Sequence, residues 1–249
     1  MKTNLSKEQK VYFRDLFREA RAKALSNAEN FEDIIFALEK LGSFLLGKIE
    51  GLGQYQNHIC KLAKKSVLAD QIPKKLSGFH TDFESLYDLV KDARNSAMHE
   101  GVFARNLTQH AIEISLILEN ALMSQEVKVK NFMIRNPVCA FDWQPISFIR
   151  QNMLANSFSY LPILHNGEWK LISDLAVSKY IQESSSKAER KKRLSKTFKE
   201  SGIKPIETRT VDALVDVKEI MNDWNGFPIC VTSKDTKEIV GILTPFDLL

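Results

Sequence analysis

The sequence has few cysteines, no long apolar run and no cluster of metal ligands, and each shortage excludes a class of protein. Its three cysteines, Cys60, Cys139 and Cys230, are odd in number and far apart, which fits a reducing compartment better than a disulfide framework. No stretch approaches the roughly 18 apolar residues of a membrane span, and residues 1–13 lack the apolar core of a signal peptide. No group of His, Cys, Asp and Glu has metal-ligand spacing. We therefore expect a cytoplasmic protein that binds no metal and no membrane.

The rest of the composition is that of a globular protein, with 44% hydrophobic and 27% charged residues in a chain of 249. This length suffices for one large domain or two modest ones. The net charge of +4 lies entirely in the second half, because residues 1–126 carry 17 basic and 17 acidic side chains. Most of the excess comes from a basic run between Lys187 and Lys199. That run is either a solvated linker helix or an arm that contacts the phosphates of RNA or DNA.

The first half has the apolar periodicity of a helical bundle. We expect helices at residues 5–25, from 27 or 30 to about 45, at 54–69, 81–101 and 106–123, with a loop at 73–78. The last of these helices is apolar on two sides, with Ile114 and Leu118 on one side and Leu116 and Met123 on the other. It should therefore pack both against its own bundle and against a second protomer.

The helix expected at 81–101 ends in the sequence DARNSAMHEG, residues 92–101. Arg94 falls near the centre of its apolar stripe, where an arginine is costly unless an anion or another chain meets it. Gly101 indicates that the helix stops there, so the last turn could unwind and bring His99 toward Arg94. The alternative is a surface arginine and an incidental histidine.

The pattern Arg94-Asn95-x-x-x-His99 resembles the signature of HEPN domains, helical bundles that often act as metal-independent ribonucleases. The resemblance implies a homodimer, or a higher even-numbered oligomer, that brings two copies of these residues into one cleft. The pattern recurs at Arg105 and His110. His110 lies on the apolar flank of its helix, where a core histidine with satisfied hydrogen bonds is the plainer reading, but both residues could contact RNA in the same cleft.

These residue types suit cleavage of RNA by its own 2′-hydroxyl group. A histidine such as His99 titrates near neutral pH, so it can remove one proton or deliver another. The guanidinium of Arg94 offers donors to the phosphate oxygens as negative charge builds on them, and the Asn95 amide could position either partner. Because DNA has no 2′-hydroxyl, the resemblance predicts an RNA substrate and requires no metal.

After residue 126 the pattern changes to short strands that alternate with helices, in two similar blocks. The first has strand patterns at 136–140, 160–164 and 169–173 and a helix at 146–155; the second has strand patterns at 206–208, 226–231 and 239–243 and a helix at 215–224. The sequences Leu-Pro-Ile-Leu and Phe-Pro-Ile-Cys, 66 residues apart, anchor the repeat. The arrangement resembles a tandem pair of CBS domains, which are βαββα modules.

The CBS resemblance implies an adenosine nucleotide (ATP, ADP, AMP or a cyclic relative) as a regulatory ligand in a cleft between the repeats. The family signature, a hydroxyl residue followed three positions later by aspartate, stands here as Thr244 and Asp247, and Ile206, Phe227 and Pro228 are the expected lining. The carboxylate can accept from both ribose hydroxyls, while the threonine hydroxyl suits a phosphate.

Two features of this motif limit the nucleotide prediction. Thr244 followed by a proline and, at the third position, by Asp247 is also a good helix N-terminus, so capping alone remains an alternative. At the matching place in the first repeat, Ser173 is followed by Ala176 instead of aspartate. We therefore expect one nucleotide per pair of repeats.

Together these patterns predict an α plus α/β protein with a HEPN-like bundle (1–126), a first CBS repeat (127–183), a basic linker (184–203) and a second CBS repeat (204–249). The leading hypothesis is a dimeric, metal-independent endoribonuclease of toxin or defence type that an adenine nucleotide regulates, with an antitoxin or another defence protein as a further partner. The alternative is a nucleotide-sensing dimeric scaffold without enzymatic activity.

Overall fold

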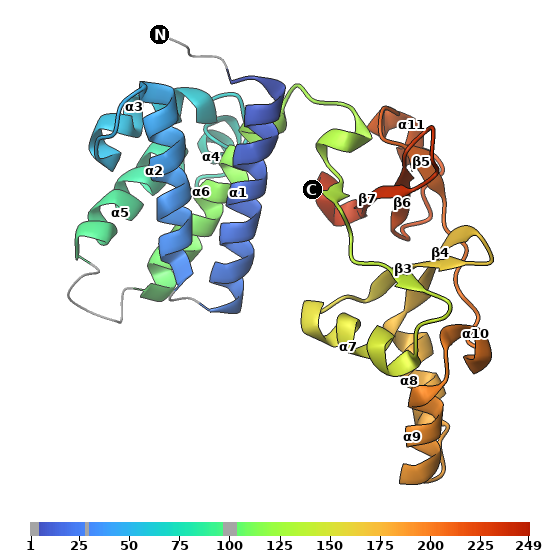
Figure 1. Cartoon of the computed structure of the whole chain (residues 1–249). Coiled ribbons are helices and arrows are strands. Elements are labelled where there is room, and N and C mark those ends of the chain that lie inside the picture. Colours follow the sequence, from blue (N-terminus) through green and yellow to red (C-terminus); the bar gives the residue numbers. More distant parts are fainter. Residues whose placement is uncertain (1–4, 28–29, 97–103) are drawn as a thin grey trace. The chain divides into compact units, whose positions relative to one another are not determined.

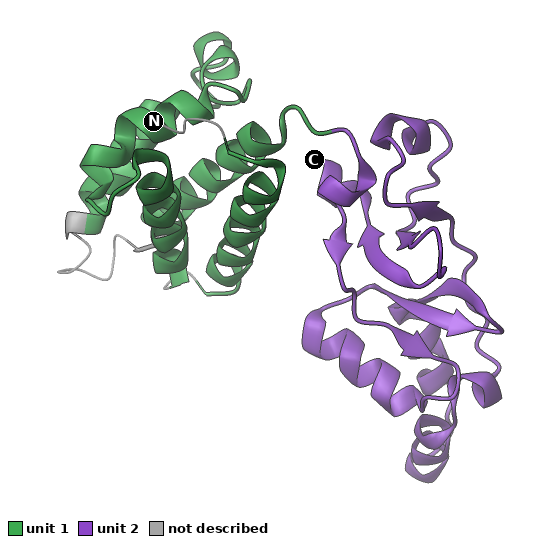
Figure 2. Ribbon diagram, turned by 45° about the horizontal axis from the view of Figure 1, so that its top comes forward, with its two compact units in different colours: residues 1–126 green, residues 127–249 purple. Residues whose placement is uncertain are grey.

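A computed structural model describes residues 5–27, 30–96 and 104–249, and within these ranges it leaves the side chains of residues 95, 96, 104 and 105 undescribed. The chain forms two compact units, residues 1–126 and 127–249 (Figure 2). The first is helical and the second combines helices with two small sheets, so the expected α plus α/β architecture is confirmed.

Six helices make up the described part of the first unit (Figure 1). They are α1 (Lys7–Ser26), α2 (Phe31–Leu46), α3 (Leu52–Ala63), α4 (Gln71–Lys75), α5 (Phe83–Ser96) and α6 (Ala104–Met123). Helix α6 packs against α1, α2, α3 and α5, so its own unit already surrounds most of it. Met123, which was expected to face a second protomer, is buried in this chain, whereas Leu116 is 43% exposed.

Local hydrogen bonds explain where several helices begin and end. Ser6 caps α1 with a reciprocal pair, in which its Oγ accepts from the Gln9 amide at 3.2 Å and its own amide donates to Gln9 Oε1 at 2.8 Å. Helix α2 ends at Gly47, which takes a left-handed φ of 80°. The segment expected to be one helix to residue 69 ends at Ala63, because the chain turns where Ser66 Oγ accepts from the Leu68 amide.

The expected loop at 73–78 is also partly wrong, because Pro73 lies inside the short helix α4. Proline is tolerated in the first turn of a helix, where its missing N–H would have had no partner in the helix.

A partly buried ionic cluster joins α1 to α6, and we call Arg18, Arg21 and Glu119 the ionic seam. Arg21 donates to both carboxylate oxygens of Glu119, from Nε at 3.0 Å and from Nη2 at 3.1 Å, and Arg18 Nε donates at 3.3 Å. The side chains of Glu119 and Arg21 are only 9% and 12% exposed. The forked pair therefore fixes the two helices in register as well as in contact.

The second unit contains two βαββ repeats, each with its own sheet. The first repeat comprises β2 (Ala140–Phe141), α7 (Ile146–Asn156), β3 (Tyr160–His165), β4 (Glu168–Ser173) and α8 (Asp174–Gln182). The second comprises β5 (Thr210–Asp212), α11 (Val217–Met221), β6 (Ile229–Thr232), β7 (Ile239–Leu243) and the short 3-10 helix η3 (Pro245–Leu248). Within each repeat the first two strands are parallel and the last two antiparallel, which is the expected repeat.

The segment before each repeat pairs with the other repeat. The segment before the first repeat contains η2 (Val129–Asn131) and β1 (Ile134–Arg135), and β1 pairs antiparallel with β7 of the second repeat. Before the second, α9 (Lys187–Ser195) and α10 (Phe198–Ser201) are followed by an antiparallel bridge between Ile206 and Leu171 of β4. The two repeats are therefore locked together by exchanged lead-in segments.

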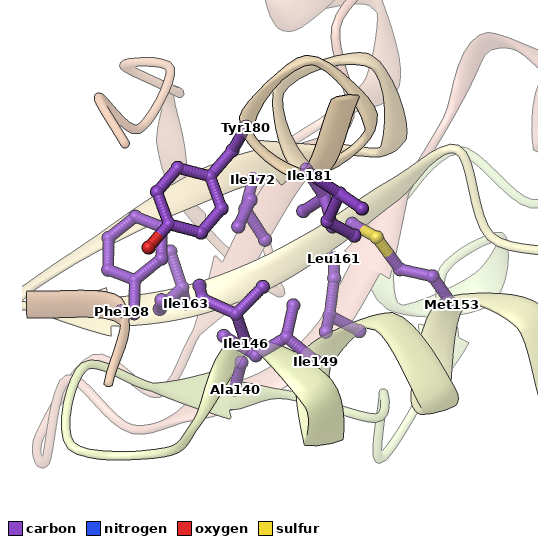
Figure 3. Close-up of a cluster of buried hydrophobic side chains, with 11 residues drawn as sticks. Ala140, Ile146, Ile149, Met153, Leu161, Ile163, Ile172, Tyr180, Ile181 and Phe198 are labelled. Carbon is purple, nitrogen blue, oxygen red and sulfur yellow. The ribbon is translucent and has the colours of Figure 1, made fainter. Parts of the chain in front are cut away.

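The cores show the same exchange. Phe198, which precedes the second repeat, lies among the buried side chains of the first, with Ile146, Ile163 and Tyr180 as neighbours in that cluster (Figure 3). Val129, which precedes the first repeat, is fully buried in the core of the second. Neither core is complete without the segment that leads into the other repeat.

Three of the expected elements differ from those observed. The strand expected at 136–140 is only β2 at 140–141, because Asn136 takes a left-handed φ of 49° directly after β1. The first strand of the second repeat is β5 at 210–212 instead of 206–208, because Ile206 is taken up by its bridge to Leu171. The helix expected at 215–224 is only α11, and the chain beyond it turns where Trp224 Nε1 donates to the Phe227 carbonyl oxygen at 2.6 Å.

Candidate functional site

Arg94 lies at the C-terminal end of α5, where the buried side of that helix has ended. Val90, one turn earlier, is 1% exposed, whereas the Arg94 side chain is 43% exposed. Its Nη2 lies 2.6 Å from Oε1 of Glu39 on α2. The carboxylate of Glu39, in the same unit, is thus the anion that Arg94 was expected to need. The apolar side of α5 does not extend as far as Arg94, whose side chain is exposed.

The other residues of the HEPN-like pattern are only partly described. His99 lies outside the described residues, and the side chains of Asn95 and Arg105 are undescribed although their backbones belong to α5 and α6. His110 on α6 is half-buried, and within the described part of the chain its buried Nδ1 has no hydrogen-bond partner. The reading of His110 as a core histidine with satisfied hydrogen bonds is therefore wrong for this nitrogen.

Thr244 and Asp247 form a capping box around η3. Asp247 Oδ2 accepts from the Thr244 amide at 2.7 Å and from its Oγ1 at 2.9 Å, and the Thr244 side chain accepts from the Asp247 amide. Asp247 is only 6% exposed. The capping alternative that the sequence left open is thus present. It is compatible with a ligand, because a carboxylate can accept about four hydrogen bonds.

Strand pairing brings the other predicted binding residues to the same end of the second sheet. Leu243 pairs with Ile229, so Thr244, which follows Leu243, lies beside Pro228, which precedes Ile229. Thr208 Oγ1 donates to the carbonyl oxygen of Pro228 and so ties the lead-in segment to the same place.

Ile206 and Phe227 complete this region at the junction of the repeats. Ile206 exchanges two backbone hydrogen bonds with Leu171 of the first repeat, at 2.7 and 2.9 Å. The ring of Phe227 meets that of Tyr160 from the first repeat edge-on, with centroids 5.7 Å apart. Strand register and hydrogen bonds join Pro228, Thr244 and Asp247. Phe227 adjoins Pro228 along the chain, and Ile206 lies two residues before Thr208, which bonds to Pro228. We call the five predicted binding residues the junction site: Ile206, Phe227, Pro228, Thr244 and Asp247.

The first repeat has no equivalent carboxylate. Ser173 at the end of β4 caps α8, and its Oγ accepts from the Ala176 amide at 3.1 Å. The Ala176 side chain has no oxygen that could accept a hydrogen bond from the Ser173 amide or from a ribose hydroxyl. The asymmetry expected from the sequence is therefore visible in the two caps.

The described ranges contain no candidate for a metal site, a reactive thiol or a membrane span. None of the described residues form a group of three or more His, Cys, Asp and Glu able to hold a metal ion. Burial raises the pKa of the Cys60 and Cys139 thiols to about 11 and that of Cys230 to about 12, so these thiols stay protonated near neutral pH. No helix among the described residues is long and apolar enough to cross a bilayer.

No model of a protein family matches the sequence, and no curated protein matches it. Solved structures similar to its C-terminal half are CBS domain proteins. One is a CBS domain-containing protein from Bacillus anthracis (TM-score 0.41, 16% identity, 50% of this chain and 91% of that one). Another is CbpB in complex with c-di-AMP (0.40, 14%, 54% and 89%). A third is the CBS domain pair of protein MJ0100 with 5′-methylthioadenosine and S-adenosyl-L-methionine (0.37, 21%, 49% and 91%).

Proposed function

We propose that the second unit is a CBS pair that binds one adenosine ligand at the junction site and thereby regulates the helical unit. The observation that carries this proposal is the strand register that sets Thr244 beside Pro228, with the lead-in segment tied to the same place by Thr208. In this proposal a hydroxyl and a carboxylate three residues apart share the site with an aromatic and an aliphatic side chain, which is the mixture that a nucleoside phosphate requires.

Four of the five junction-site residues have a direct role in this proposal. The Asp247 carboxylate accepts hydrogen bonds from the ribose hydroxyls, and Phe227 and Ile206 supply apolar contacts to the adenine ring. The Thr244 hydroxyl, which now donates to Asp247 Oδ2, turns to donate to a phosphate oxygen. The ribose hydroxyls then replace it at the carboxylate, so no buried oxygen loses its partner.

Calorimetry of the full chain tests this function. The similar structures suggest c-di-AMP, S-adenosyl-L-methionine and 5′-methylthioadenosine as ligands, to which ATP, ADP and AMP are added. We expect a stoichiometry of one and a Kd that Asp247→Asn raises by about tenfold or more, because hydrogen bonds to a charged group contribute about 1.5–3 kcal/mol.

Glu200→Gln is a matched control for Asp247→Asn. Thr197 and Glu200 form a capping box of the same geometry on α10, with Glu200 Oε2 accepting from the Thr197 amide at 3.0 Å and from its Oγ1 at 2.9 Å. The control therefore loses a similar cap while the junction site is intact. Absence of binding by every ligand, or equal affinities for wild type and Asp247→Asn, would reject the proposed site.

Regulation follows if the ligand prefers one arrangement of the protein. The ligand can shift such an equilibrium by no more than the difference between its affinities for the two arrangements. A homodimer or larger even-numbered oligomer is the expected assembly, and light scattering with and without nucleotide measures it. In its simplest form the protein is a nucleotide-sensing scaffold that carries no activity of its own.

A second candidate function is RNA cleavage by the helical unit, and the observation that favours it is the accessible, anchored guanidinium of Arg94. In this proposal His99 takes the proton from a 2′-hydroxyl, whose oxygen attacks the adjacent phosphorus. The 5′-oxygen leaves with a proton from the second subunit's histidine, and a 2′,3′-cyclic phosphate forms. Arg94 holds the phosphate oxygens, Asn95 positions them, and Arg105 and His110 contact the RNA.

RNA incubated with the protein, with and without each nucleotide, tests this candidate. Cleavage should disappear in His99→Ala and fall strongly in Arg94→Gln, while DNA of the same sequence stays intact. Lys74→Gln removes an exposed cation from the same unit and should change nothing. If RNA is not cleaved with any ligand, or if His99→Ala cleaves it as well as wild type does, this candidate is rejected. The scaffold function is then the one that remains. A toxin or defence role, with an antitoxin or another defence protein as partner, is proposed by analogy with the family.

A further inference from the structure

A cavity in the C-terminal unit is lined by none of the junction-site residues. It has a volume of about 690 Å³ and lies between α8, α9 and the chain that follows α10. Its volume falls within the range of roughly 300–1,000 Å³ that is typical of pockets for small ligands. The residues that line it include five cations, Lys179, Lys192, Arg193, Lys196 and Lys204, but only two acids, Glu183 and Glu189.

Arg193 uses its charge within the protein. Its Nη1 donates to Glu183 Oε2 at 3.1 Å and to the Tyr180 carbonyl oxygen at 2.9 Å, and its Nε donates to Glu189 Oε1 at 3.3 Å. The guanidinium also lies over the Tyr180 ring, 5.0 Å from its centroid. Both acids of the cavity are thus occupied by one arginine, which clamps α9 onto α8.

The pKa directions support this division of charge. Hydrogen bonds from Ser185, and then from Arg193, lower the pKa of Glu189, so its carboxylate stays ionised and bound to the arginine. Burial raises the pKa of Tyr180, so its hydroxyl stays neutral. Neither group therefore changes the charge of the cavity near neutral pH.

The four lysines of the cavity are left to face solvent. Each is exposed, and in the part of the chain that the structure describes none of them forms an ion pair. They come from three segments, with Lys179 on α8, Lys192 and Lys196 at the end of α9 and Lys204 after α10. Four ammonium groups around one concavity repel one another, and a multivalent anion that sits between them relieves this repulsion.

We propose that this cavity, which we call the lysine pocket, binds an oligophosphate group, either free or as the phosphate chain of a nucleotide. Three or more phosphate charges can be shared among four ammonium groups, each of which supplies up to three donors. The rest of the basic run has a different placement, since Arg190 and Lys191 belong to α9 but do not line the cavity. Only part of the basic run therefore lines the lysine pocket, which distinguishes a concave binding site from a uniformly basic helix surface.

Titration calorimetry of the full chain with inorganic triphosphate tests the assignment, with ATP, adenosine and a short RNA as further arms. We expect triphosphate to bind, and the double variants Lys192→Gln/Lys196→Gln and Lys179→Gln/Lys204→Gln each to raise its Kd by about tenfold or more. The two variants alter different segments, so their agreement identifies the cavity. Binding should also weaken as salt is added, because exposed charges are screened.

Arg190→Gln/Lys191→Gln is the matched control, because it removes the same charge from the same helix outside the cavity. Its Kd should stay within about twofold of wild type, since exposed charges outside the cavity are largely screened. An equal loss in control and pocket variants would show a diffuse basic surface and overturn the proposal. The proposal would also be overturned if triphosphate did not bind or if only RNA bound. Displacement of triphosphate by adenosine would overturn it as well, because the triphosphate would then occupy the junction site instead of the lysine pocket.

Discussion

Replacing Glu119 by glutamine tests whether the ionic seam holds the helical unit together. Glutamine keeps the shape of the side chain but removes the charge that faces Arg18 and Arg21. Arg21 would lose its forked pair with a carboxylate, and its side chain is only 12% exposed, so water can replace little of what is lost. The two guanidinium groups would also repel each other without an anion between them.

The expected cost follows from the burial of the three side chains. Removing one partner of a fully buried ion pair costs about 3–5 kcal/mol, since it strands the other charge. Here Arg18 remains 25% exposed and can be partly rehydrated, so we expect a loss of about 2–4 kcal/mol. Domains are stable by only about 5–15 kcal/mol, and this loss corresponds to a Tm about 10 °C lower.

Urea denaturation of the full chain, followed by far-ultraviolet circular dichroism, measures the change. Glu19→Gln is the matched control, because it removes the same charge from α1 where the side chain is 68% exposed and paired with Lys23. The control should change the free energy of unfolding by less than about 0.5 kcal/mol. A loss below about 1 kcal/mol for Glu119→Gln would show that the seam contributes no more than a surface pair.

Two further predictions concern the second unit and the cysteines. Phe198→Ala should destabilise the second unit by about 3–5 kcal/mol in urea denaturation, and a loss below about 1 kcal/mol would mean that the exchanged segment is dispensable. The thiols of Cys60, Cys139 and Cys230 have folded pKa values raised to about 11–12 by burial. Their contribution to stability is fully present below the unfolded pKa of about 8.5 and is lost as the pH rises from there through the folded values. Because little thiolate is present in the folded chain at pH 8, alkylation should be much slower there than in the unfolded chain. Rapid alkylation of the folded chain would contradict this.

Helices set by local periodicity were predictable from the sequence. The apolar spacing places α1, α2 and α6 within about two residues of their observed bounds, which is the usual uncertainty of a helix end. The apolar spacing predicts helix ends less well where a polar side chain competes for backbone hydrogen bonds. Ser66 turns the chain after α3, and Asn30 stands at the N-cap position of α2 without the side-chain hydrogen bond that its type suggests.

Contacts between distant residues were not predictable in the same way. The exchange of lead-in segments depends on pairs such as Ile134 with Ile242 and Ile206 with Leu171, which no local pattern specifies. Likewise, the charge of Arg94 indicates that an anion is needed but not that Glu39 supplies it.

The candidate sites likewise combine features that follow from local sequence with features that depend on contacts between distant residues. The motif Thr-x-x-Asp identifies Thr244 and Asp247 without any structure, because its spacing is local. Their position beside Pro228 depends on the register of β6 and β7, and the lysine pocket depends on how α9 folds back onto α8. A signal for that pocket was present, since Lys192 and Lys196 are spaced to share one face of a helix, but the contributions of Lys179 and Lys204 are visible only in three dimensions.

Amide hydrogen exchange of the full chain, with and without a saturating adenine nucleotide, tests the central claim most directly because it reports where the ligand binds. Protection should increase in three segments that are distant in the sequence, 206–208, 227–231 and 243–247, and the caps at 173–176 should exchange as before. Increased protection at 173–176, or no change at 243–247 despite bound nucleotide, would contradict a ligand site built on Thr244 and Asp247.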